Sequence, residues 1–192
     1  MKSIYKKISL PIILSLLIAT AIIGCKKDDD DQPRLVENEE ELITSVFVNY
    51  KDSSTSINEV AKFRDPDGEG GNDPIQFDTI RLTKGKTYEV SVEFLDESNP
   101  LDIEDITEEV REEGAEHFIC FEVDVNSGVT ITKTDSDGQY PIGLTSEWMT
   151  DLTAMPFNGT LKLILKHQPD VKDGTCAPGD TDVEINFPLI IN

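Results

Sequence analysis

Strict alternation of apolar and polar residues is the feature that most constrains the fold of this chain. Between positions 87 and 94, Tyr88, Val90, Val92 and Phe94 alternate with threonine, serine and two glutamates. Successive side chains of a β-strand point to opposite faces of the sheet, so a period of two indicates a strand with one buried face. The dominant secondary structure of the chain is therefore expected to be β.

The same alternation recurs along the chain after position 41, and turn-forming pairs such as Asp67-Gly68 and Asn158-Gly159 separate the runs. The apolar sets are Leu42, Val46, Val48 and Tyr50; Ile119, Phe121 and Val123; Val129 and Ile131; Leu161, Leu163 and Leu165; and Val183, Ile185, Phe187 and Leu189. Pro188 cannot donate a hydrogen bond and predicts that the last strand lies at an edge or a bulge. We predict an antiparallel immunoglobulin-like β-sandwich of about 7–9 strands.

One acidic segment, residues 102–115, departs from this period. Its apolar residues recur at spacings of three and four, which predicts a short amphipathic helix. Asp102 or Asp105 can cap its first turn, and Gly114 is expected to end it. The apolar stripe consists of Ile103, Ile106 and Val110.

The first 24 residues are typical of an export signal. Lysines precede an apolar run at positions 8–23, which is shorter than the about 20 residues of a membrane-spanning helix. The run ends in Gly24-Cys25, and this ending resembles the lipobox of bacterial lipoproteins. The resemblance implies that Cys25 becomes a lipidated N-terminus, whose acyl chains contribute about 0.8 kcal/mol per buried CH₂ to membrane anchoring.

Residues 25–40 are expected to form the lipidated cysteine and a flexible acidic tether ahead of a β-sandwich at 41–192. Directly after Cys25, two lysines precede four aspartates. This run resembles the signal that sends Bacteroidetes lipoproteins to the outer face of the outer membrane. The resemblance implies a lipid-anchored outer-membrane protein at the cell surface, with the periplasmic face as the alternative.

The charge balance restricts the partners. The chain has 38 acidic against 17 basic residues and a formal net charge of −21. Nucleic acid is excluded as a partner, because neutralising phosphates requires a basic surface. Cations, basic protein surfaces and neutral ligands remain, although an acidic surface also serves solubility alone.

Three cysteines are present, and the predicted lipid takes Cys25. In an oxidising compartment Cys120 and Cys176 can form a disulfide. Cys120 lies in an apolar stretch, so a buried free thiol is the alternative.

Two groups of residues are candidate metal sites. Glu113 and His117 are four residues apart, which places them on one face if the helix extends that far. With His167, the second of two histidines in the chain, they would supply zinc ligands if the fold brings them together. The alternative is a solvated acidic helix and two unrelated histidines.

The second candidate is the glycine-rich loop at positions 65–73. Asp65, Asp67 and Asp73 are hard oxygen donors suited to calcium. The spacing matches the start of an EF-hand loop and then fails, since Gln76 stands where the closing glutamate is needed. Ordinary turn chemistry is the alternative. The sequence requires no cofactor, and the cofactor that it suggests is a divalent metal ion.

Catalytic motifs are absent: the sequence contains neither G-x-S-x-G nor H-E-x-x-H. We therefore expect a protein that is not an enzyme. The leading interpretation is a lipid-anchored, non-catalytic binding module or accessory of an outer-membrane receptor. A divalent-metal (zinc or calcium) binding accessory lipoprotein is the alternative, and an enzyme is the third.

Several segments together resemble a group of uncharacterised Bacteroidetes envelope lipoproteins. The resemblance implies an envelope lipoprotein, in some cases an accessory of uptake receptors, and it carries over no site residue. The segments are positions 41–44, 65–73, 105–109 with 116–117, 165–167 and 182–188.

Overall fold

The computed structural model describes residues 41–55, 57–68 and 70–192. The predicted signal peptide, Cys25 and the predicted tether lie outside this part of the chain. The first half contains β1 (Ser45–Asp52), β2 (Asn58–Arg64), β3 (Gln76–Phe77), β4 (Ile80–Leu82), β5 (Thr87–Asp96) and β6 (Glu104–Asp105). The second half contains α1 (Ile106–Glu112), β7 (His117–Val123), the 3-10 turn η1 (Val125–Ser127), β8 (Val129–Lys133), β9 (Thr145–Thr150), β10 (Phe157–His167) and β11 (Asp180–Ile191).

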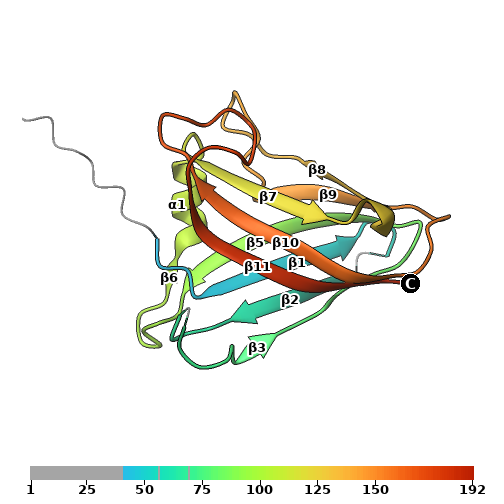
Figure 1. Ribbon diagram of the computed structural model, residues 1–192, viewed down its shortest axis with the longest axis horizontal. Helices are drawn as coiled ribbons and strands as arrows, with labels where there is room; N and C mark the ends of the chain where they lie inside the picture. Colours follow the sequence, from blue (N-terminus) through green and yellow to red (C-terminus); the bar gives the residue numbers. More distant parts are fainter. Residues whose placement is uncertain (1–40, 56, 69) are drawn as a thin grey trace, which may run out of the picture. The chain divides into compact units, whose positions relative to one another are not determined.

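The strands form two sheets, and the predicted β-sandwich is confirmed (Figure 1). The larger sheet has the order β3-β2-β1-β5-β9-β8, with β6 added on β5. The smaller sheet has the order β4-β11-β10-β7, in which β4 and β11 are parallel and the other neighbours are antiparallel. More strands are described than the predicted 7–9, because β3, β4 and β6 are too short to show a period.

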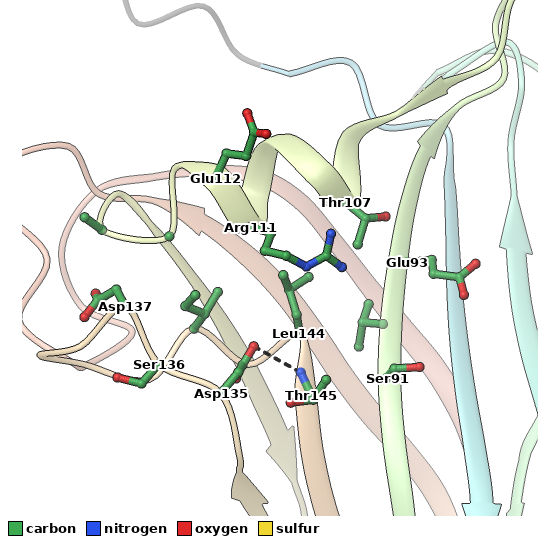
Figure 2. A pocket seen from close by; sticks show the side chains of 14 residues that line it. Ser91, Glu93, Thr107, Arg111, Glu112, Asp135, Ser136, Asp137, Leu144 and Thr145 are labelled. Atoms are coloured by element: carbon green, nitrogen blue, oxygen red, sulfur yellow. Dashed lines mark hydrogen bonds between the residues drawn. The ribbon is translucent and has the colours of Figure 1, made fainter.

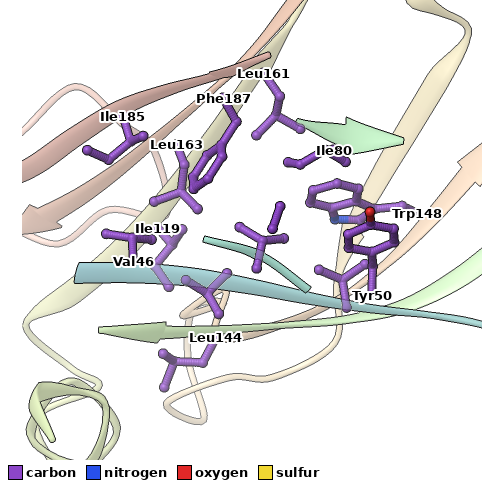
Figure 3. Close-up of a cluster of buried hydrophobic side chains, with 14 of the residues drawn as sticks. Val46, Tyr50, Ile80, Ile119, Leu144, Trp148, Leu161, Leu163, Ile185 and Phe187 are labelled. Carbon is purple, nitrogen blue, oxygen red and sulfur yellow. The ribbon is translucent and has the colours of Figure 1, made fainter. Parts of the chain in front are cut away.

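The inward faces of both sheets form one core, seen in Figure 3. Trp148, Phe187, Leu161 and Leu163 are fully buried there. Each such side chain contributes about 1.5–3 kcal/mol of stabilisation by leaving water. The alternating residues that predicted the strands are largely the ones that meet in this layer.

The helix is shorter than its predicted range. Asp105 is the N-cap, and its side chain accepts a hydrogen bond from the Thr107 amide. The preceding residues cannot be helical because Glu104 and Asp105 pair with β5 as β6. Val110 is buried, which anchors α1 on the core. The last helical residue is Glu112 and Glu113 is the C-cap, so the predicted end near Gly114 is confirmed to within two residues.

A disulfide joins Cys120 of β7 to Cys176, and it holds the long connection between β10 and β11 on the outer face of the smaller sheet. Of the two alternatives that the sequence left open, the structure has the bridge. Phe118, Cys120 and Ile164 form a small second apolar cluster on this face.

Candidate functional site

The two histidines lie side by side at one end of the smaller sheet. His117 is the first residue of β7, His167 is the last residue of β10, and the two are paired in the strand register. Their rings stack with centroids 4.7 Å apart and an angle of 7° between planes. Residues separated by fifty positions in the sequence therefore form one imidazole pair.

Strand alternation explains why both rings point inward. His117 continues the inward face that Ile119 occupies, and His167 continues the face of Leu165. His117 is 0% exposed and His167 is 7% exposed. The histidines thus take the last inward positions of two neighbouring strands, where an apolar residue would ordinarily close the core.

Four carboxylates from three other parts of the chain surround this pair. Three groups of residues each have ligand atoms that all lie within 4.8 Å of one another. The groups are Glu113, His117 and His167; Glu41, His117 and Asp182; and Glu41, Glu109 and Glu113. Burial and the charges of Glu41 and Glu113 raise the pKa of Glu109. The cluster is therefore strongly negative and suited to a cation.

The hydrogen bonds of His117 settle the tautomer of its neutral form. Nδ1 lies 3.2 Å from the backbone oxygen of Glu113, which can only accept, so Nδ1 carries a proton. Nε2 then faces Oε1 of Glu41 at 3.1 Å. Two acceptors at this distance need a proton or a metal ion between them. Burial lowers the pKa of His117, but the hydrogen bond and the charge of Glu41 outweigh it, and the pKa is raised.

His167 is buried without hydrogen bonds. Within the described residues neither of its ring nitrogens has a hydrogen-bond partner, although Nε2 lies 3.5 Å from Oε2 of Glu116. A Cβ at Gly179, whose φ is +77°, would collide with the His167 carbonyl oxygen, so the chain returns tightly against this residue. An unsatisfied buried polar group costs about 1–3 kcal/mol, and this cost calls for an explanation.

The arrangement can hold a transition metal after small movements. Zinc binds imidazole nitrogen at about 2.0–2.1 Å in a tetrahedron, so its ligand atoms lie roughly 3.4 Å apart. Imidazole lone pairs lie in the ring plane, and one ring must leave the parallel stack for both to reach one ion. Rotation of the His167 ring breaks no hydrogen bond within the described residues, although it breaks the stacking on His117. The His117 Nδ1 bond to a carbonyl oxygen is the orienting contact that metal-bound histidines usually make.

The sequence named Glu113, His117 and His167 as candidate ligands on the condition that the fold brings them together, and the structure does bring them together. The helical spacing behind the first pair is wrong: α1 ends at Glu112 and His117 belongs to a strand. Glu41 and Asp182 were not predicted from the sequence. Glu41 precedes β1 and Asp182 lies on β11, so no local spacing links them to the histidines.

The Asp65 loop is not assembled as the calcium interpretation requires. Among the described residues, no group of three converging ligand atoms includes Asp65, Asp67 or Asp73. Oδ2 of Asp67 instead accepts hydrogen bonds from the Asn72 amide and side chain at 2.8 and 2.6 Å. These bonds are ordinary turn chemistry, and they occupy an oxygen that calcium would need.

A separate hollow of about 560 Å³ lies beside α1 (Figure 2). Arg111 leans into it from the helix, while Asp135 accepts hydrogen bonds from the Gly143 and Thr145 amides on the opposite wall. Ser136 donates to the Tyr140 carbonyl oxygen. Asp135 and Ser136 are thus used to hold the 134–145 loop.

No helix in the described part of the chain is both long and apolar enough to cross a bilayer. Comparison of the chain with protein-family models, with curated proteins and with solved structures finds no match to any of them.

Proposed function

We propose that this protein is a non-catalytic envelope lipoprotein whose folded domain binds a divalent transition-metal cation, with zinc as the best chemical match. The ion is held by His117 and His167 together with carboxylates drawn from Glu113, Glu41 and Asp182. Imidazole nitrogen with carboxylate oxygen suits zinc and its neighbours, whereas calcium prefers oxygen alone.

One observation carries this proposal: His167 is buried and stacked on His117, it has no hydrogen bond to either ring nitrogen among the described residues, and Nε2 of His117 faces the carboxylate of Glu41. A proton on His117 relieves its contact with Glu41, but it leaves both nitrogens of His167 without a hydrogen bond. A metal ion takes one nitrogen of each ring, which is Nε2 for His117, and it offsets the charge of the surrounding acids in the same step. Binding then also explains why polar residues occupy positions at the edge of an apolar core.

The proposed location of the domain is argued from the sequence. Lipid on Cys25 and a tether at residues 26–40 would hold the domain at the outer membrane, on the cell surface or on the periplasmic face. This placement rests on the lipobox-like ending at Gly24-Cys25 and on the lysine-aspartate run after it. In either location the domain would meet metal ions outside the cytoplasm.

Zinc is expected to raise the melting temperature of the full chain. A ligand at 100 times its Kd adds about 2.7 kcal/mol of stability, and for a domain of this size this is roughly 5–10 °C. Thermal unfolding is followed by circular dichroism after EDTA treatment, and then with zinc or calcium added. We expect the shift with zinc and no comparable shift with calcium.

Two variants locate the ion. His167→Gln is expected to abolish the zinc shift relative to its own EDTA baseline. Asp65→Asn with Asp67→Asn, which changes the loop that the sequence favoured for calcium, is expected to leave the zinc shift intact. A zinc shift that survives His167→Gln, or no shift at zinc concentrations up to the millimolar range, would overturn the proposal.

A further inference from the structure

The first part of β11 has a free edge. β11 pairs with β10 along its length, but β4 pairs on the other side only at Leu189–Ile191. Within the described residues no strand covers that side between Asp180 and Pro188. Pro188 immediately precedes the first residue that pairs with β4. Proline has no backbone N–H, and at this position its absence removes no hydrogen bond between β11 and β4. The edge is therefore a row of backbone groups open to another strand.

A groove of about 740 Å³ runs along this edge, between the two sheets. One wall is β11 itself, at residues 181–186, and the other is formed by residues 65, 68 and 70–74 with Phe63 and Phe77. Phe77 is 47% exposed although its ring packs against the rings of Phe63 and Phe187. The groove thus offers apolar surface beside open backbone.

The charge of the groove has one sign. Asp65, Asp73, Asp182 and Glu184 line it, although Oε1 of Glu184 is already paired with Nζ of Lys162 at 2.8 Å, and none of the described lining residues is lysine or arginine. Asp65 is 8% exposed, and its Oδ1 has no hydrogen-bond partner among the described residues. Burial, followed by the charge of Asp67, raises the pKa of Asp65. A carboxyl in this setting gains from a cationic partner.

We infer that this groove receives an extended, basic segment of another protein, which adds to β11 as a further strand. Backbone hydrogen bonds to the free edge supply affinity, as in other cases of strand addition. Lysine or arginine side chains place their apolar stems on Phe77 and Phe63 and their charged ends among the carboxylates. A second copy of this chain is electrostatically disfavoured as the occupant, because its net charge of −21 has the same sign as the groove.

This inference goes beyond metal binding and does not depend on it. Asp182 belongs both to the groove and to the histidine cluster, so the test leaves Asp182 unchanged. His117 and His167 are not among the lining residues. Loss of zinc binding and loss of peptide binding are therefore separable results.

The test measures fluorescence anisotropy of labelled peptides with the full chain in detergent. A peptide of alternating lysine and valine, about eight residues long to span the free edge, is expected to bind. The same peptide methylated on alternate backbone nitrogens keeps its charge but loses strand donors, and it is expected not to bind. Asp65→Asn with Asp73→Asn should weaken the lysine peptide about tenfold, since each tenfold change corresponds to about 1.4 kcal/mol.

The matched control removes two charges elsewhere. Glu147→Gln with Glu89→Gln lies on the outer face of the larger sheet, and it should leave peptide affinity within about twofold of the unchanged chain. Equal weakening by both double variants would mean diffuse charge attraction and would overturn the inference. Undiminished binding of the methylated peptide, or no binding of the lysine peptide at low salt, would also overturn it.

Discussion

Replacing Asp137 with alanine should lower the free energy of unfolding by about 3–5 kcal/mol at neutral pH. Its carboxylate accepts a 2.7 Å hydrogen bond from Nζ of Lys172, and the two side chains are 7% and 3% exposed. Lys172 also donates to the backbone oxygen of Gly114. Removal of Asp137 leaves a buried ammonium without its counterion, which costs more than the pair contributes.

The pH dependence of this ion pair has a defined sign. Burial raises the pKa of Asp137, but the hydrogen bond from Lys172 and those from the backbone amides of Tyr140 and Gln139 outweigh burial and lower the pKa to about 2. The pKa of Asp137 in the folded protein therefore lies below 3.8, the ordinary value of an aspartate. The stabilisation that the Asp137 carboxylate gives to the fold is therefore complete above pH 4, and it is lost as the pH falls toward about 2.

Urea unfolding at several pH values measures both effects. The difference between the unchanged chain and Asp137→Ala should be largest near pH 7 and should shrink below pH 4. Lys172→Met in the Asp137→Ala background should recover part of the loss. As a control, Glu89→Ala breaks the exposed ion pair between Glu89 and Lys51, in which the glutamate side chain is 65% exposed and the lysine side chain 42% exposed. This variant should cost less than about 1 kcal/mol. Equal losses from the two alanine variants would contradict this account.

Removal of the disulfide should cost about 4 kcal/mol. Cys120 and Cys176 are separated by 56 positions, and closing a loop of that length restricts the unfolded chain by about this free energy. Cys120→Ala with Cys176→Ala is compared with the unchanged chain by urea unfolding. The bridge also fixes the connection that follows His167, so the double variant should bind zinc more weakly.

Reductant supplies the control for the disulfide. It should lower the unfolding midpoint of the unchanged chain toward that of the double-alanine variant. It should leave the variant itself unaffected. An unchanged midpoint after complete reduction would show that the bridge does not contribute to stability.

The sheets could be predicted from the sequence because their signal is local. Tyr88, Val90 and Val92 alternate within one segment, and an inward face is needed whatever strand pairs with it. The short strands β3, β4 and β6 could not be predicted, because two or three residues show no period. The Asp105 cap was predictable since the cap and its first turn are adjacent in the sequence.

The site was predictable only in part, since it is assembled by tertiary pairing. His117 and His167 were candidates because imidazole is uncommon in this chain and binds metals. Their stacking depends on the register between β7 and β10, which no short segment encodes. Glu41 joins the cluster through the approach to β1, and it could not be distinguished from the other acids of so acidic a chain.

The central claim is that His117 and His167 together bind one metal ion, and X-ray absorption at the zinc edge tests it most directly. The full chain is loaded with one equivalent of zinc and compared with His167→Gln. The account predicts two imidazole nitrogens at about 2.0–2.1 Å with carboxylate oxygens completing the shell, and a single imidazole in the variant. A shell of oxygens alone, or a spectrum that His167→Gln does not change, would contradict it.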